Sequence, residues 1–278
     1  MNATVVRSDV TYVERPRVRL LGVPLHPVTA DTVDRVLDEF VDSHSHRQIV
    51  TVNVDFLSVA RRNARFRDVL ERAHLVVPDG APVLWALRAR GSDLPSRITG
   101  PDLIRAAVRH SRAHGTRIYF LGGVPGTATR AIAALRHEFG PFEVAGASAP
   151  NAGVTSEHDR RIAEEVRETE PDFIFVGFGC PKQDLWIYDH RHILDRSVCV
   201  GVGGSFSYLS GAIRRAPEWA QRRGLEWAFR LGAEPRRLAR RYLIDDLPVL
   251  VRLAIETVNR REAKEGTYGS HDTYRDPH

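Results

Sequence analysis

Residues 172–184 read DFIFVGFGCPKQD, in which an apolar segment passes directly into a glycine-rich turn and then into residues that suit the start of a helix. The same order recurs at 120–126, which reads FLGGVPG, and at 202–205, which reads VGGS. These apolar segments do not alternate with polar residues, which is typical of strands covered on both faces of a parallel sheet. The three segments therefore predict an α/β fold with a mostly parallel sheet.

Outward from these segments, β-branched or aromatic runs alternate with helical patterns from residue 17 to 210, and we interpret this region as one Rossmann-like α/β domain, a mostly parallel sheet flanked by helices. The expected strands are Val18–Leu21, Gln48–Val54, Leu75–Val77, Arg117–Leu121, Phe142–Ala145, Asp172–Val176 and Val198–Val202. The expected helices lie near 29–43, 55–73, 82–90, 101–114, 126–139 and 156–169.

Helical patterns dominate after residue 211. Residues 211–261 contain twelve Arg, no Lys and six acids, so this segment carries a formal charge of +6, against +5 for the whole chain of 278 residues. Apolar residues recur among the Arg at helical spacing, and Pro248 is expected to kink or divide the helix. We interpret 211–261 as a basic helical appendage. Such a segment can lie at an anionic membrane surface, or it can pack on the core or on another subunit.

The two ends of the chain lack apolar periodicity. Residues 1–16 predict a flexible N-terminus and residues 262–278 a disordered tail. The first twenty residues hold no apolar run of the kind found in a signal peptide, and no segment reaches the roughly 18 apolar residues of a membrane span. Cys180 and Cys199 match no zinc or redox spacing, so we expect free thiols in a reducing compartment.

The glycine turns are candidates for binding a nucleotide. Ligands of open α/β sheets lie beyond the carboxyl ends of the strands, where glycine lets the backbone approach and a helix N-terminus favours phosphate. Gly122, Gly123 and Gly179 stand at such positions, although a glycine after a strand is often only a tight turn. No turn matches the GxGxxG fingerprint or the P-loop.

Asp79 lies in PDG at 78–80, at the end of an expected strand and just before a helix. A carboxylate there can act as a general base, an effect worth about 10²–10⁴-fold in rate, or it can cap the helix. Thr51 and Asn53 alternate along an apolar strand, so they share one face. They can contact a sugar or satisfy one another in a core network.

Further polar candidates precede two helices. Lys182 and Gln183 open a helix after the turn at 177–181 and can face the crevice of the sheet, although a lone Lys is often solvated. Arg97 begins RITGPD, a turn leading into a helix whose start Asp102 favours. No HExxH motif, Cys/His ligand pair or Asp-x-Asp at a strand end is present, so no metal site is expected. Without a metal ion, the negative charge of a diphosphate leaving group would have to be stabilised by Arg, Lys or helix dipoles.

Taken in order, these segments resemble the WecG/TagA/CpsF glycosyltransferases, family 26 of the carbohydrate classification. The resemblance covers about Val18 to Tyr242. It rests on TVN at 51–53, PDG at 78–80, RxxGxD at 97–102, LGG at 121–123, GFGCPKQD at 177–184, RAPEW at 215–219, GLEW at 224–227 and RLGAEPRR at 230–237. Each motif is short, but the ordered set is highly specific.

The resemblance implies inverting transfer from a UDP-sugar donor to a polyprenyl-diphosphate-linked sugar acceptor during assembly of a cell-wall polymer or exopolysaccharide. The sugar implied is of the N-acetylmannosamine, N-acetylmannosaminuronate or glucose type. A cytoplasmic enzyme is implied, peripheral on the inner face of the cell membrane and bound to its anionic surface, without a metal cofactor. A homo-oligomer is left open.

Residue roles follow from the same resemblance. Asp79 matches the proposed catalytic base. The resemblance implies that Thr51, Asn53 and Gln183 line the donor-sugar pocket. It also implies that Arg230, Arg237 and Arg240 contact phosphate and close the site at the membrane.

The chain departs from the family pattern at two places. Ser207 follows Phe206 where relatives usually have Asp, and residues 147–150 read ASAP where relatives often have a glycine-aromatic pair. Both positions belong to the presumed donor side, so the identity of the sugar stays open.

Two other classes of function remain as alternatives. A Rossmann-type NAD(P)-dependent oxidoreductase would need the glycine fingerprint and its partner acid, which the first strand-to-helix turn lacks. A non-catalytic nucleic-acid-binding module could use the basic appendage, but its aromatic residues form no stacking platform. We therefore expect no nucleic-acid partner.

Overall fold

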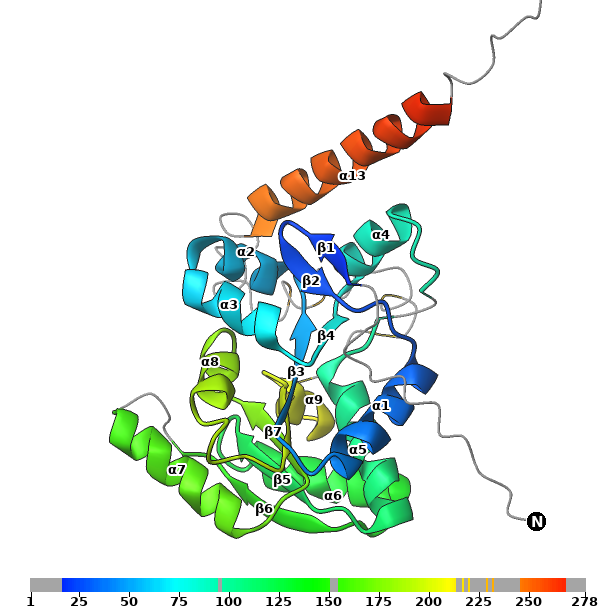
Figure 1. Ribbon diagram of the computed structural model, residues 1–278. Helices are drawn as coiled ribbons and strands as arrows, with labels where there is room; N and C mark the ends of the chain where they lie inside the picture. The colour runs from blue at the N-terminus through cyan, green and yellow to red at the C-terminus, as the bar shows by residue number, and fades with distance from the viewer. Residues whose placement is uncertain are drawn as a thin grey trace, which may run out of the picture.

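The computed structural model describes residues 17–94, 97–150, 155–213 and 246–268, and also 217, 220, 229 and 232. It confirms the expected α/β fold (Figure 1). Six parallel strands form one sheet in the order β4-β3-β8-β7-β5-β6. Their bounds are β3 Arg47–Val52, β4 Leu75–Pro78, β5 Ile118–Gly122, β6 Val144–Ser148, β7 Phe173–Gly177 and β8 Val198–Gly201.

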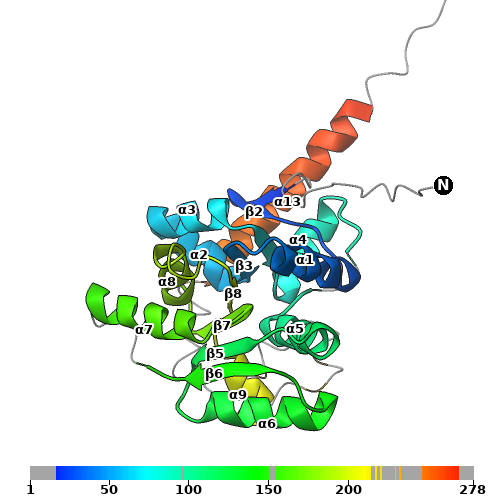
Figure 2. The same cartoon turned by 60° about the horizontal axis from the view of Figure 1, so that its bottom comes forward.

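Helices cover both faces of this sheet (Figure 2). Because successive strand residues point to opposite faces, Phe173 and Phe175 belong to one core cluster and Ile174 and Val176 to another. The first cluster includes residues of α1 Ala30–Asp42, α5 Gly100–His114, α6 Thr127–Phe139 and α9 Ser205–Leu209. The second includes residues of α7 Ser156–Glu168 and α8 Lys182–Asp189.

A third cluster joins the two ends of the described chain. It contains residues of α2 Val54–Arg62, α3 Ala64–Arg72, α4 Ala81–Ala89 and α13 Leu247–Tyr268, with those of the strands β1 Val18–Leu20 and β2 Val23–Leu25. Glu256 of α13 accepts a hydrogen bond from the Leu21 N–H (3.1 Å) and forms an ion pair with Arg90 (2.9 Å). The C-terminal helix is therefore docked against the first described residues (Figure 1).

Three elements differ from the sequence-based expectations. Val18–Leu21 is not a strand of the main sheet; β1 ends at Leu20 and pairs with β2 in an antiparallel hairpin. The helix expected at 55–73 is divided at Asn63, whose side chain accepts from the Phe66 N–H (3.0 Å) and caps α3. The strand expected at Phe142–Ala145 instead spans Val144–Ser148.

The C-terminal helix also differs from expectation. Pro248 lies in the first turn of α13, where a missing N–H is tolerated, and residues 241–245 before it lie outside the described part of the chain, so the expected kink or division stays a prediction. The helix continues to Tyr268, so residues 262–268 of the expected disordered tail are helical. Good helix formers follow residue 260, and an anchored helix gains one hydrogen bond for each further residue. The expected flexible segment 1–16 lies outside the described residues, as does most of 214–245.

No helix in the described part of the chain has both the length and the apolar character that crossing a bilayer requires.

Phe120 provides a test of the core. Its side chain is fully buried, with ring centroids of Phe206 and Phe175 at 5.6 and 6.2 Å. We expect Phe120→Ala to lower the free energy of unfolding by about 3–5 kcal/mol, because it leaves a cavity in the core cluster that covers one face of the sheet. Val124→Ala shortens the side chain of a residue that is 62% exposed and should change the free energy of unfolding by less than about 0.5 kcal/mol. Urea unfolding of both variants measures this, and equal losses would contradict the assigned core.

Candidate active site

The carboxyl ends of the parallel strands meet around Gly201, at the end of β8. The Thr51 hydroxyl on β3 donates to the Gly201 carbonyl oxygen (3.4 Å). A Cβ at Gly201 would lie 2.5 Å from both Gln183 Nε2 and Asp184 Oδ1. The first turn of α8 is therefore packed directly against the end of β8, and only glycine fits between them.

Asp79 stands at the rim of this edge and is half-buried. It follows β4, and its N–H donates to the Val52 carbonyl oxygen of β3 (2.8 Å). The N-cap of α4 is Gly80, with φ +94° and no side-chain cap hydrogen bond. The alternative role of Asp79, as the N-cap of this helix, is therefore not the one observed, and its carboxylate lies one residue before the cap.

The structure brings Asn53 next to this turn. A Cβ at Gly80 would lie 3.7 Å from Asn53 Cβ, so the two segments are in contact. Asn53 Oδ1 accepts from the Phe56 N–H (3.3 Å) and caps α2. Thr51, by contrast, is buried inside β3 and uses its hydroxyl on Gly201. Of this expected pair, Asn53 is the member placed at the rim with Asp79.

Gln183 connects two of the glycine turns. Its side chain is buried, and Oε1 accepts from the N–H groups of Gly179 (3.2 Å) and Gly203 (2.8 Å). The Gly123 N–H donates to the Gly177 carbonyl oxygen (3.0 Å), which joins the third turn to the other two. Because these three N–H groups already have acceptors, a phosphate at this edge must be met by other donors.

The predicted glycines differ in the space around them. A Cβ at Gly122 would lie 2.7 Å from the Phe178 ring, and one at Gly123 would lie 2.9 Å from the Phe206 ring. These two glycines are needed for packing. Gly179 has φ +82°, and no described atom lies within 4 Å of its Cβ position. Gly179 is therefore the predicted glycine that a ligand can approach.

Two predicted cationic residues adjoin the same edge. Lys182 is partly exposed, with Nζ 5.8 Å from the centroid of the Phe178 ring. Arg97, also partly exposed, precedes Ile98, whose N–H donates to the Pro78 carbonyl oxygen beside Asp79 (3.0 Å). Arg230, Arg237 and Arg240 lie outside the described residues.

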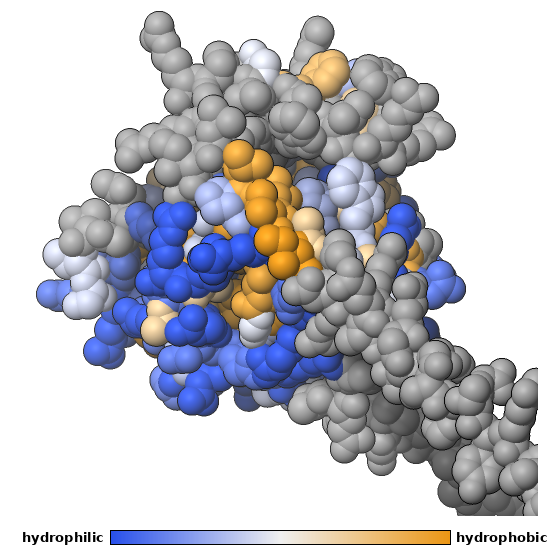
Figure 3. Space-filling view, turned by 90° about the horizontal axis from the view of Figure 1, so that it is seen from above, coloured by the Kyte–Doolittle hydropathy of each residue, from blue (hydrophilic) through white to orange (hydrophobic). Residues whose placement is uncertain are grey.

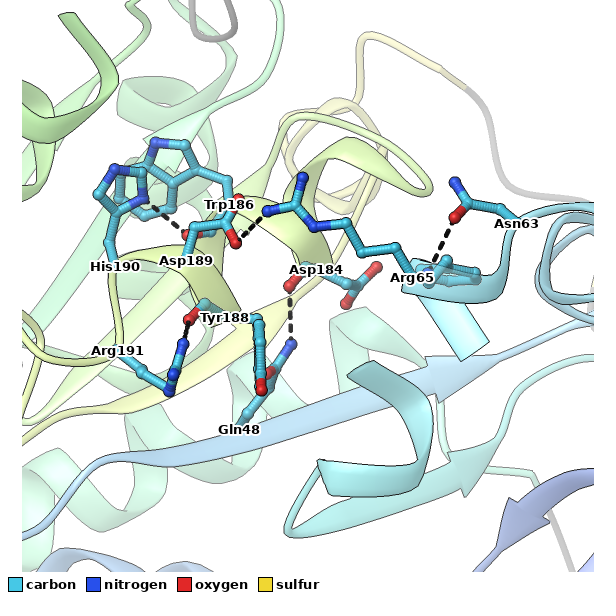
Figure 4. A network of polar contacts seen from close by, with 10 residues as sticks. Gln48, Asn63, Arg65, Asp184, Trp186, Tyr188, Asp189, His190 and Arg191 are labelled. Carbon is cyan, nitrogen blue, oxygen red and sulfur yellow. Dashed lines mark hydrogen bonds and ion pairs between the residues drawn. The ribbon is translucent and has the colours of Figure 1, made fainter. Parts of the chain in front are cut away.

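Contacts from other elements hold α8 in place (Figure 4). Gln48 Nε2 on β3 donates to the Asp184 carbonyl oxygen (3.1 Å), and Arg65 on α3 forms an ion pair with Asp189 (2.6 Å). These contacts join α8 to β3 at Asp184 and to α3 at Asp189, and Gln183 lies directly before the first of them.

Asp184 is a buried acid that the sequence presents only as a favourable residue for a helix start. It is fully buried, and neither carboxylate oxygen has a hydrogen-bond partner of normal geometry among the described residues (Figure 4). Desolvation raises the pKa of Asp184 to about 7, and this outweighs the opposite effect of the adjacent Gln183 side chain. Its position in DLWI, before three apolar residues, is the only sequence signal of this burial.

The two family departures lie in different places. Ser207 is buried in α9, next to Phe206, which packs against Gly123. Ala147 and Ser148 belong to β6, the edge strand, which β5 and β7 separate from β8. Ser148 pairs with Leu121, directly before Gly122, so both departures lie close to the linked glycine turns.

Two shallow hollows in the described part of the chain lie elsewhere. One is lined by His46, Gln48, Arg72, His74, Tyr188 and Arg191. The other is lined by Glu164, Arg167, His192, Ile193 and Asp195. Neither includes Asp79 or a glycine turn.

Comparisons with known proteins found a matching family model and several similar proteins. The model of the Glycosyl transferase WecG/TagA/CpsF family matches residues 18–263. Three similar proteins are each named N-acetylglucosaminyldiphosphoundecaprenol N-acetyl-beta-D-mannosaminyltransferase. That of Bacillus spizizenii is 33% identical over 218 residues, covering 76% of this chain and 83% of its own length. That of Bacillus subtilis is 29% identical, covering 75% and 80%, and that of Staphylococcus aureus strain NCTC 8325 is 26% identical, covering 81% and 87%.

Asp184→Asn should change how stability depends on pH. The pKa of this group is raised from 3.8 to about 7 on folding, so the folded state binds more protons between these values. The contribution of Asp184 to stability is therefore full at low pH, falls as pH rises from about 4 to about 7, and is constant above. The wild type should therefore lose stability between pH 5 and pH 8, whereas the variant should not. Measured by urea unfolding at the two pH values, the difference between the free energies of unfolding of variant and wild type should shift in favour of the variant by at least about 1.4 kcal/mol, the equivalent of one pKa unit.

The control for this experiment is Asp195→Asn, which removes an exposed carboxylate and should keep the pH dependence of the wild type. If Asp184→Asn also keeps that dependence, the buried carboxyl group is not titrating in this range.

Proposed function

This chain belongs to the WecG/TagA/CpsF family of glycosyltransferases, and from this premise we propose that it moves N-acetylmannosamine from a UDP-sugar to a polyprenyl-diphosphate-linked N-acetylglucosamine. The names of the three relatives support the acceptor and the sugar, because each describes mannosaminyl transfer to N-acetylglucosaminyldiphosphoundecaprenol. The UDP leaving group is what the family resemblance implies. Family membership also sets aside the oxidoreductase and the nucleic-acid-binding module.

The position of Asp79 is the observation that carries the mechanism. Its carboxylate follows β4 at the rim of the sheet, half-buried, beside Asn53 and the turn that carries Arg97. In the proposed reaction Asp79 takes the proton of the acceptor hydroxyl as that oxygen forms a bond to the anomeric carbon. The bond from this carbon to UDP breaks, UDP leaves with the electron pair, and a single displacement inverts the configuration.

Cationic side chains would stabilise the charge that develops on UDP. The N–H groups of Gly123, Gly179 and Gly203 are already bonded within the protein, so they support this role poorly. Lys182 and Arg97 lie at the correct edge, and Arg230, Arg237 and Arg240 remain predicted phosphate ligands. Removing one such stabiliser typically costs about 10²–10³-fold in turnover. We propose that these cations act without a metal cofactor.

An exposed apolar stripe on α13 supports action at a membrane surface. Leu247, Val251 and Ile255 are 48%, 50% and 54% exposed, and their spacing of four residues places them on one helix face. Hydrophobic side chains gather into a stripe on the face of the molecule seen from above (Figure 3). The opposite face of α13 is docked through Val249 and Leu253. Such a stripe, within a basic segment, suits the inner face of the cell membrane, where a lipid-linked acceptor would lie.

Asp79→Asn tests the base. We expect at least a 100-fold loss of transfer with folding unchanged, because an amide cannot accept the hydroxyl proton. The measurement is UDP released from UDP-N-acetylmannosamine with a polyprenyl-diphosphate-linked N-acetylglucosamine, alongside a panel of other UDP-sugars and with EDTA as a test of metal independence. Asp93→Asn removes an exposed carboxylate and should retain activity. Transfer at the wild-type rate by purified Asp79→Asn would refute the assignment.

The double variant Val251→Glu/Ile255→Glu tests the membrane surface. Co-sedimentation with anionic phospholipid vesicles should fall several-fold, because two charges replace exposed apolar side chains. Val124→Glu, at another exposed apolar position, should bind as the wild type does. These substitutions are sharper than truncation before Arg230, since truncation would also remove Val249, Leu253 and Glu256 from the packed hairpin. Unchanged binding by the double variant would place the anchor elsewhere.

A further inference from the structure

Three metal-ligating side chains from two helices meet at a site remote from Asp79. His110 and His114 lie one turn apart near the end of α5, and Asp38 lies on α1. One ligand atom from each of the three falls within 4.8 Å of the others. We propose that Asp38, His110 and His114 form a binding site for a divalent transition-metal ion of the zinc class.

The distances agree with such a site. His110 Nε2 lies 3.2 Å from Asp38 Oδ1. In a tetrahedral zinc site with bonds of about 2.0–2.1 Å, adjacent ligand atoms stand about 3.3 Å apart. All three ligand atoms lie within 4.8 Å of one another, and the rings of His110 and His114 have centroids 4.6 Å apart, so the third ligand atom would have to move closer by side-chain rotation to reach this spacing. Water would fill the remaining position.

A hydrogen bond behind His110 orients its ring. His110 Nδ1 lies 2.9 Å from Thr116 Oγ1, and Nε2 faces Asp38 Oδ1 at 3.2 Å. In the tautomer that carries its proton on Nδ1, this N–H donates to the Thr116 hydroxyl and the Nε2 lone pair is available to a metal ion. Metal-bound histidines commonly donate their second N–H in this way, which holds the ring in place.

The surroundings also favour a divalent cation. The carboxylates of Asp172 and Asp42 lie close enough to His110 to interact with its charge, in addition to that of Asp38. Neutral imidazole and carboxylate are ligands that zinc prefers.

The location indicates a structural role for the ion. His110 and His114 lie in the last turns of α5, whereas the first turn of α5, at Gly100, contacts Val202 and Ser205 at the carboxyl edge. About ten helical residues, or about 15 Å, separate the two ends. An ion here would join α1 to α5 on one face of the sheet, away from the carboxyl edge at which Asp79 lies. The proposal is therefore independent of the proposed reaction.

The test is titration of the untagged full chain with Zn²⁺ by calorimetry, and with Co²⁺ by visible absorption. We expect one site with a micromolar or tighter Kd, a rise in Tm of several degrees with Zn²⁺, and little effect of Mg²⁺. His114→Ala and Asp38→Asn, both at exposed positions, should each weaken binding at least tenfold and remove most of the Tm rise.

His137→Ala is the matched control, since it removes an exposed helical histidine outside the cluster, and it should bind Zn²⁺ as the wild type does. Equal Zn²⁺ affinity in the wild type, His114→Ala and Asp38→Asn would overturn the proposal, as would binding weaker than millimolar. UDP release by Asp38→Asn, measured in parallel, should match the wild type, because this outcome depends only on the distance of the site from Asp79.

Discussion

The carboxamide oxygen of Gln183 holds together the edge of the sheet on which the proposed reaction depends. It accepts from Gly179 and Gly203, and so joins the turns that follow β7 and β8. N–H groups shielded from water are costly when they lack acceptors, so this one buried side chain stabilises both tight turns. The same bonds withdraw these N–H groups from anion binding, which is why the proposed contacts to a diphosphate are assigned to cationic side chains.

Asp184 shows the cost of this arrangement. The residue next to Gln183 places a carboxyl group in the core, where burial raises its pKa to about 7. A buried acid without hydrogen-bond partners lowers stability, and such groups gather at functional sites more often than elsewhere. Its close contact with Gly201 means that the start of α8, and with it Gln183, has little freedom to move.

The chain also closes on itself around this edge. Asp79 follows β4, whereas α13 returns from the far end of the sequence to pack near α4 and the β1–β2 hairpin, through Glu256 and Arg90. One face of α13 is thereby buried and the other left apolar and exposed. A helix that is docked and also presents an apolar stripe can bring the sheet edge to a lipid-linked acceptor, because both belong to one packed unit.

The sequence by itself determined the parallel α/β class, the family and the candidate base. Apolar runs followed by glycine, such as residues 172–179, predict buried strands because this pattern depends only on local conformation and on burial of both strand faces. Asp79 could be identified as the candidate base because it lies in PDG, one of the ordered motifs of the family. Only the tertiary structure decided the strand order, the β1–β2 hairpin, the use of the Thr51 hydroxyl on Gly201 and the meeting of Asp38 with His110. The physical reason is that a local sequence pattern specifies the backbone conformation and which side of a helix or strand is buried. Hydrogen-bond partners and distances between ligand atoms are decided only when distant segments pack together.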